Sequence, residues 1–328
     1  MNRIFIFLLC IFSCNQNNKI TLQGLEFGTS YSVQYFSENQ TNFSNEIDSI
    51  FGLINSSMST YIDNSIISRV NNNESIEVDN HFINVFNTSK KIFNKTNGKF
   101  DPSVGVLVNF WGFGPNYIKK PIDSLEFISL KKLVGFDMFE IDNSNHIIRP
   151  KNSFLDFNAI AKGYSVDLIS VFLENNDINN YLVEIGGEIR VKGINLSKND
   201  PWIVGIDAPK YDITREIFNT TELKNSAMAT SGVYRKYKVD SKGNRYAHIL
   251  DPISGYPTKT NILSVSVISD NCIESDAYAT ALHAMSLTEI DIFLTINTDL
   301  DAYIIYENEK NEIVDKSYNN FTTSYKPE

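Results

Sequence analysis

The stretch DFNAIAKGYSVDLISVFLENNDINNYLVEIGGEIRVK, residues 156–192, decides the fold. It predicts a helix over residues 159–175, followed by strands over residues 181–185 and 188–192. Gly186 and Gly187 separate the two strands and supply the backbone freedom that a tight turn needs. We therefore expect a helix that leads directly into two neighbouring strands joined by a glycine turn.

The predicted elements on either side do not follow a regular βαβ rhythm. Strands are predicted over residues 25–36, 202–207, 262–269 and 302–306, and helices over residues 45–58, 79–96 and 275–285. No GxGxxG motif follows a strand, which argues against a doubly wound dinucleotide-binding sheet. We therefore expect an α+β fold with mixed and antiparallel sheets and packed helices.

Composition sets limits on the class of ligand. The chain has 328 residues, of which 42% are hydrophobic and 12% aromatic, so it can bury a sizeable core and is not a disordered protein. Its formal net charge is −10. Because binding to a phosphate backbone needs a basic face, a nucleic-acid partner is not expected. An anionic ligand would need a metal, helix N-termini or local lysines.

The first residues carry targeting signals. The apolar run over residues 4–12 follows Arg3 and is shorter than the ~20 residues that span a bilayer, so residues 1–13 are predicted to be a signal peptide. IFSC, residues 11–14, resembles a bacterial lipobox, with Cys14 as the lipidated residue and residues 14–24 as a tether. An ordinary signal peptide is the alternative. Residues 25–328 would form a single domain on the extracytoplasmic side of a membrane in the cell envelope.

Two segments combine glycines with aromatic or charged residues. In GKFDPSVGVLVNFWGFGP, residues 98–115, glycines between large rings could admit a flat ligand or could form a turn that caps the core. In residues 156–163, free N–H groups and Lys162 could hold an anion while Asp156 accepts a ligand hydrogen bond. A helix cap with a surface lysine is the alternative.

Two further segments offer metal ligands and a base. Asp276 and Thr280 are four residues apart, so their oxygens share one helix face and suit Mg²⁺. Taken without the other segments, a helix cap with a mid-helix threonine is the favoured explanation of this pair. His248 ends a strand directly before a turn. A general base suits such an exposed edge, and a hydrogen-bonded structural histidine is the alternative.

Taken in order, these segments resemble the FAD:protein FMN transferase family (ApbE type). The resemblance covers roughly residues 25–290. The matching blocks are GTSY 28–31, MSTY 58–61, SRVN 68–71, FDPSVG 100–105, WGFGP 111–115, LDFNAIAKG 155–163, VEIGGEIR 183–190, ATSGVYR 229–235, HILDP 248–252, GYP 255–257 and DAYATAL 276–282. The resemblance implies the T-fold-related architecture of that family.

The resemblance also implies roles for individual residues. Those matching the FAD site are Phe27, Tyr61, Lys99, Phe100, Asp101, Asp156, Lys162 and Leu250. Those matching the metal site are Asp276, Thr280, the carbonyl of Ala159, and Ala279, which stands where some relatives have a second Asp. His248 matches the candidate base, and Asp251 is grouped with it as a catalytic candidate. Phe27 stands where many relatives have Met.

The activity implied is Mg²⁺-dependent transfer of FMN from FAD to a Thr or Ser hydroxyl of a partner protein, with release of AMP. The implied acceptor is a membrane redox subunit facing the same compartment. Two alternatives use the same residues. Water could replace the acceptor, giving an FAD pyrophosphatase, or the chain could be a flavin-binding lipoprotein without catalysis.

Overall fold

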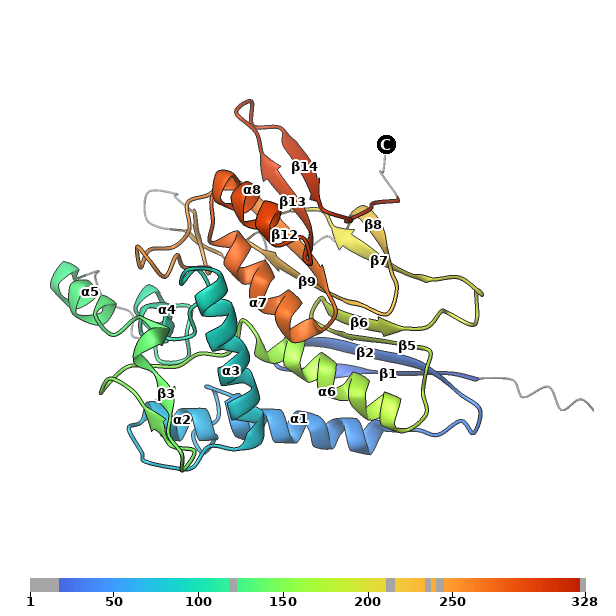
Figure 1. Cartoon of the computed structure of the whole chain (residues 1–328), viewed down its shortest axis with the longest axis horizontal. Helices are drawn as coiled ribbons and strands as arrows, with labels where there is room; N and C mark the ends of the chain where they lie inside the picture. Colours follow the sequence, from blue (N-terminus) through green and yellow to red (C-terminus); the bar gives the residue numbers. More distant parts are fainter. Residues whose placement is uncertain (1–17, 118–122, 211–215, 234–236, 240–244, 325–328) are drawn as a thin grey trace, which may run out of the picture.

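The computed structural model describes residues 18–117, 123–210, 216–233, 237–239 and 245–324. The predicted signal peptide, Cys14, and Tyr234 and Arg235 of the ATSGVYR block lie outside these residues. The centre of the fold is an eight-stranded antiparallel sheet (Figure 1). Its strands are, in spatial order, β1 (Asn18–Glu26), β2 (Thr29–Ser37), β5 (Tyr181–Ile185), β6 (Glu188–Lys192), β9 (Ala227–Gly232), β12 (Ile262–Ser269), β13 (Asp301–Glu307) and β14 (Ile313–Tyr318).

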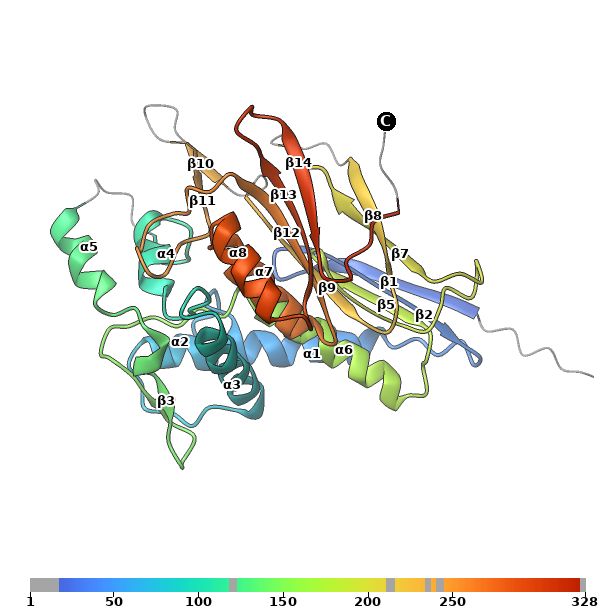
Figure 2. The same ribbon diagram turned by 45° about the horizontal axis from the view of Figure 1, so that its top comes forward.

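Helices cover one face of this sheet, and a short hairpin packs on the other. The covering helices include α6 (Ala161–Asn175) and α7 (Cys272–His283), which cross the sheet side by side, with α1 (Ser44–Met58), α3 (Asn80–Lys95) and α8 (Leu287–Ile296) around them (Figures 1 and 2). The hairpin of β7 (Trp202–Asp207) and β8 (Ile217–Leu223) shares an apolar cluster with β6 and β13. The expected α+β fold is confirmed.

Smaller elements surround this centre. They are α2 (Ile66–Asn71), α4 (Gly105–Trp111), α5 (Ser124–Lys131), a 3-10 turn (Phe136–Met138), β3 (Glu140–Ile141), β4 (Ile147–Ile148), β10 (Tyr237–Val239) and β11 (Arg245–Ala247). Among the described residues, every helix is too short or too polar to cross a bilayer.

The predicted strand over residues 25–36 is instead a hairpin. β1 pairs with β2 along its whole length, from Asn18 with Ser37 to Glu26 with Thr29. Phe27 and Gly28 form the two-residue turn, with φ of 52° and 73°, and positive φ at both positions gives the twist that such hairpins require. Residues 18–24 therefore belong to the sheet and not to a tether, because their backbone groups are paired with β2.

The other predicted elements agree with the structure to within a few residues. The strands over residues 181–185, 188–192, 202–207 and 262–269 match their predicted bounds, and β13 extends the prediction for residues 302–306 by one residue at each end. Helix α7 differs: it begins at Cys272 and not at Ser275, because the Asn271 side chain accepts the Glu274 N–H and caps it. Asp276 consequently lies in the second turn, where it is no helix cap.

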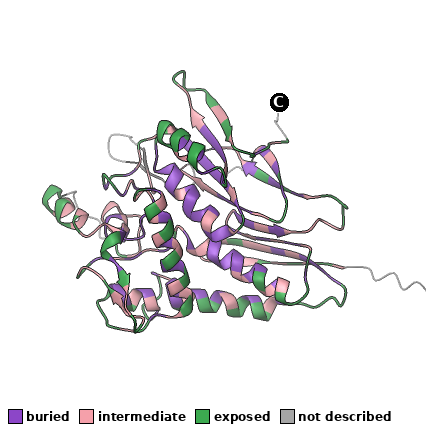
Figure 3. Ribbon diagram, viewed as in Figure 1, coloured by how far each residue is buried: buried purple, intermediate pink, exposed green. Residues whose placement is uncertain are grey.

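The crossing of α6 and α7 depends on Gly163. A Cβ at this position would lie 2.3 Å from the carbonyl oxygen of Cys272 and 2.8 Å from Cβ of Asp276. The close approach lets the Gly163 N–H donate a hydrogen bond to Oδ2 of Asp276 at 3.0 Å. Both helices are largely buried along this contact (Figure 3).

One turn after Gly163 on α6, Asp167 fixes the start of α7. Its carboxylate accepts the N–H groups of Cys272 and Ile273 at 2.9 and 2.8 Å and also pairs with Arg190. The N-terminus of a helix favours a negative charge, so this carboxylate stabilises α7 where it meets α6. Two contacts thus position Asp276: the Gly163 N–H bonds to its side chain, and Asp167 holds the first turn of its helix.

Replacement of Gly163 by Ala should destabilise the fold by about 1–3 kcal/mol, because the added methyl group overpacks a contact made with backbone. Urea unfolding followed by circular dichroism measures this change. Gly52→Ala is the matched control: no atom of the described residues lies within 4 Å of a Cβ there, and Gly52 is inside helix α1, so the substitution should stabilise by about 0.5–1 kcal/mol. Equal stability of Gly163→Ala and the wild type would contradict the packing argument.

Candidate active site

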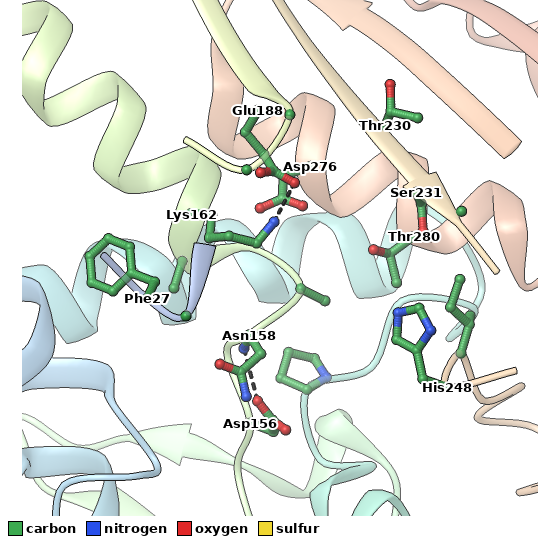
Figure 4. Close-up of a pocket in the computed structure, with 18 of the residues that line it drawn as sticks. Phe27, Asp156, Asn158, Lys162, Glu188, Thr230, Ser231, His248, Asp276 and Thr280 are labelled. Carbon is green, nitrogen blue, oxygen red and sulfur yellow. Dashed lines mark hydrogen bonds and ion pairs between the residues drawn. The ribbon is translucent and has the colours of Figure 1, made fainter. Parts of the chain in front are cut away.

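The predicted site residues converge on one cavity of about 920 Å³. It lies between the β1–β2 turn, the loop around residue 100, the ends of β6 and β9, and the facing sides of α6 and α7. Every residue predicted for the site lines it except Asp251 and Ala279. Figure 4 shows Phe27 and His248 on opposite sides of the cavity, with Asp276 and Thr280 from α7 above Asp156.

Helix α7 presents oxygen atoms to the cavity. Asp276 and Thr280 lie one turn apart on α7, and both line the cavity, as their spacing predicts. Ala159 lines the cavity just before α6 begins. Among the described residues there is no group of three or more His, Cys, Asp or Glu side chains that could hold a metal. A carboxylate, a hydroxyl and a backbone carbonyl still fit Mg²⁺, which takes oxygen ligands and keeps several of its waters.

Ala279 does not reach this cavity. It is 1% exposed and packs in the main apolar cluster, the largest that the described residues form, which includes Phe82, Val265 and Ile304. Since neighbouring positions on a helix point in different directions, a residue one place before Thr280 faces the core when Thr280 faces the cavity. The predicted metal role of Ala279 therefore has no support from its position.

A charged cluster joins α6, α7 and the sheet. Lys162, near the start of α6, pairs with the buried carboxylate of Glu188, the first residue of β6. Burial opposes the charge on Lys162, but Glu188 and Asp276 outweigh it and raise the pKa of Lys162. Burial also raises the pKa of Asp276; Lys162 opposes this shift and Glu188 adds to it. The charges thus lie close enough that Glu188 shifts the pKa values of both Lys162 and Asp276.

Glu188 is a cavity residue that the sequence patterns did not single out. It follows the Gly186–Gly187 turn, where both glycines have positive φ, and it is 3% exposed. The quoted block VEIGGEIR contains it, but a charge at the start of a strand ordinarily faces solvent. The structure shows instead that β6 pairs with β5 and that Glu188 points toward Lys162 of α6, so this position lines the cavity.

The loop around residue 100 is held by its own polar groups. Oδ1 of Asp101 accepts the backbone N–H of Ser103 at 2.7 Å and its hydroxyl at 2.5 Å, and Oδ2 accepts the Phe136 N–H at 3.3 Å. Burial raises the pKa of Asp101 to about 6. Phe100 is almost fully buried in the main apolar cluster. Asp101 and Phe100 therefore shape this wall of the cavity chiefly by fixing the backbone.

Lys99 ties three segments together beside the cavity. Its ammonium group donates to the carbonyl of Ala284 at 3.2 Å and pairs with Glu289 at 3.3 Å and Asp251 at 3.6 Å. The carboxylate of Asp251 also accepts the N–H groups of Ile253 and Ser254. Asp251 consequently orders the turn that follows His248 and lies outside the cavity, so the geometry does not support a catalytic role for it.

Tyr61 and Asp156 lie at the open side. The Tyr61 side chain is 61% exposed, and its ring lines the cavity. Oδ1 of Asp156 accepts the Asn158 N–H at 2.8 Å, and the Asp156 N–H donates to the carbonyl of Pro102. The alternative role of Asp156 as a cap of α6 is not observed, because α6 has Ile160 at its N-cap and no side-chain cap.

His248 follows β11 and contributes its ring to the wall opposite Phe27. The ring is partly exposed, and its centroid is 6.4 Å from that of Phe113 in an edge-to-face arrangement. Leu250, two residues on, is 6% exposed and also lines the cavity. Thr230 and Ser231 on β9, which stand in the ATSGVYR block, also line the cavity (Figure 4). The Thr230 hydroxyl is hydrogen-bonded to that of Ser266 at 2.8 Å.

Comparison with known proteins places this cavity in a family. The ApbE family model matches residues 27–304. The FAD:protein FMN transferase of Vibrio cholerae is 32% identical over 310 residues, which cover 89% of this chain and 92% of the relative. The protein of the same name from Haemophilus influenzae is 31% identical over 315 residues, covering 89% of this chain and 90% of the relative.

Solved structures agree with the sequence match. The flavin transferase ApbE from Vibrio cholerae superimposes with a TM-score of 0.82 at 30% identity, covering 92% of this chain and 98% of that one. The apo form of the flavinyl transferase ApbE from Pseudomonas stutzeri gives a TM-score of 0.83 at 27% identity, covering 92% and 95%. With the fold, the order of the motifs and the matched length in agreement, the chain belongs to the ApbE family.

Proposed function

We propose that this chain transfers the FMN part of FAD to a hydroxyl group of another protein. The observation that carries the proposal is that one cavity gathers the Asp276–Thr280 face of α7, Lys162, the exposed ring of Tyr61 and His248. A volume of about 920 Å³ is large among small-molecule sites, which suits a dinucleotide. The names of the relatives, FAD:protein FMN transferase, describe the same reaction.

The proposed chemistry is a phosphoryl transfer. The acceptor oxygen forms a bond to the phosphorus on the riboflavin side of the diphosphate, the bond from that phosphorus to the bridging oxygen breaks, and AMP leaves. A nitrogen of the His248 ring accepts the hydroxyl proton. Tyr61 stacks on a flat ring of FAD, and Asp156 accepts a hydrogen bond from a ligand N–H or hydroxyl. Such transfers depend mainly on positioning and on charge neutralisation.

Mg²⁺ completes the proposed site. Asp276, Thr280 and the carbonyl of Ala159 would hold it, and it would supply charge neutralisation for the phosphate oxygens. Within the protein itself, the Lys162 ammonium group lies on the same side of the cavity, paired with Glu188. A chain with a net charge of −10 needs such local positive groups to bind a diphosphate.

The products test this function. Purified protein, FAD, Mg²⁺ and Thr-containing candidate peptides should yield AMP together with a peptide heavier by FMN minus water in intact-mass spectrometry. A chelator in excess should abolish both products. Release of free FMN and AMP with unmodified peptide would indicate an FAD pyrophosphatase, and intact FAD after long incubation would indicate a flavin-binding protein.

Replacement of His248 by Ala should leave FAD affinity unchanged and slow transfer by about 10²–10⁴-fold, which is the usual contribution of a general base. Flavin fluorescence measures the affinity and AMP release measures the rate. His146→Ala is the matched control, because His146 lies outside the cavity and bonds to Asp142 near the β3–β4 hairpin. Unchanged turnover in His248→Ala would remove this residue from the mechanism.

We also propose that Cys14 carries a lipid that anchors the protein on the extracytoplasmic side of a bacterial membrane, where a membrane redox subunit would be its acceptor. Support comes from the apolar run over residues 4–12 and the lipobox-like IFSC that ends at Cys14. Mass spectrometry of the mature protein should find an N-terminal lipidated Cys14. In Cys14→Ser the protein should leave the membrane fraction; retention of that variant in the fraction would contradict the anchor.

A further inference from the structure

One carboxylate oxygen of a residue that lines the cavity has no hydrogen-bond partner in the part of the chain that the structure describes. Glu188 is 3% exposed and lines the cavity, and its Oε1 pairs with Lys162. Its Oε2 is buried and accepts no hydrogen bond from any described residue. A buried charged oxygen without a partner is costly, so such an atom in a binding cavity points to a ligand that approaches it.

The charges around this oxygen favour a positive ligand. The carboxylates of Glu188 and Asp276 lie beside each other, with the Lys162 ammonium group next to them (Figure 4). Their proximity is also felt electrostatically, since Glu188 is among the groups that raise the pKa of Asp276. When Asp276 is ionised, the two carboxylates and one ammonium group leave one negative charge in a buried place, which is why burial raises the pKa of Asp276. A cation would neutralise that remaining charge.

The backbone holds Glu188 in this position. Gly186 and Gly187 adopt positive φ in the turn that leads into β6, and a Cβ at Gly186 would lie 2.8 Å from Thr29 and 3.4 Å from Oε2 of Glu188. The Glu184 carboxylate accepts the Gly187 N–H at 2.8 Å and secures the same turn. The Glu188 side chain is therefore placed by a fixed turn, and not by Lys162 alone.

We propose that Glu188 is part of the divalent-cation site: its Oε2 accepts a hydrogen bond from a water molecule bound to the ion, while Oε1 keeps Lys162 in place. This inference rests on the proposed function, because it takes the Asp276–Thr280 cation site as given. Mg²⁺ retains several waters, so the site needs acceptors beyond its direct ligands. A purely structural ion pair with Lys162 would not explain why Oε2 of this cavity-lining residue is buried without a partner among the described residues.

Calorimetric titration of Mg²⁺ into FAD-free protein tests the inference without relying on activity. Glu188→Gln should weaken Mg²⁺ binding about 10–100-fold, the usual cost of losing a partner that supports a metal site indirectly. Glu184→Gln is the matched control, since it removes the same charge from the neighbouring strand of the same cavity while its amide oxygen can still accept the Gly187 N–H. Glu184→Gln should change the Mg²⁺ affinity less than Glu188→Gln does.

The outcomes separate the two proposals. If wild-type protein binds no Mg²⁺, the cation site and the role of Glu188 are both wrong. If wild-type protein binds Mg²⁺ and Glu188→Gln binds it equally well, only the role of Glu188 is wrong. Melting temperatures without metal show whether Glu188→Gln folds. Should it not fold, Glu188→Asp keeps the charge but shortens the reach, and unchanged affinity in that folded variant would overturn the inference.

Discussion

The hydrogen bond from the Gly163 backbone to the buried carboxylate of Asp276 is the contact on which the site depends. It exists only because glycine lets α6 approach α7 so closely that any side chain would collide with the Cys272 carbonyl. The same contact brings Lys162 to the carboxylates and aims the Asp276–Thr280 face at the cavity. The close packing of α6 against α7 therefore also positions the charged side chains of the cavity.

Electrostatics explain how an acidic chain can hold an anionic dinucleotide. The protein carries a net charge of −10, yet two lysines line the cavity: Lys162, paired with Glu188, and Lys99, paired with Asp251 and Glu289. The carboxylates that surround Lys162 keep it protonated and leave a deficit of positive charge next to Asp276. A cation placed there would serve both the protein and the diphosphate, which links the composition of the chain to its proposed reaction.

The parts of the fold and of the cavity that depend on periodicity and spacing could be predicted from the sequence. The strands around Gly186–Gly187 and the shared face of Asp276 and Thr280 follow from local rules, and the structure confirms them. The β1–β2 hairpin was missed because its turn uses Phe27 at positive φ, a position that sequence rules give to Asn or Gly. Glu188 was missed, and Asp251 and Ala279 do not line the cavity, because a side chain's neighbours across the fold depend on tertiary packing that no local pattern encodes.

Diffraction from crystals grown with FAD and Mn²⁺ tests the central claim most directly, since anomalous scattering locates the ion. The account predicts a peak beside the Asp276 carboxylate and the Thr280 hydroxyl, with the diphosphate of FAD next to it and a flavin-nucleotide ring against Tyr61. A peak elsewhere on the protein, or FAD bound outside the cavity, would contradict the account.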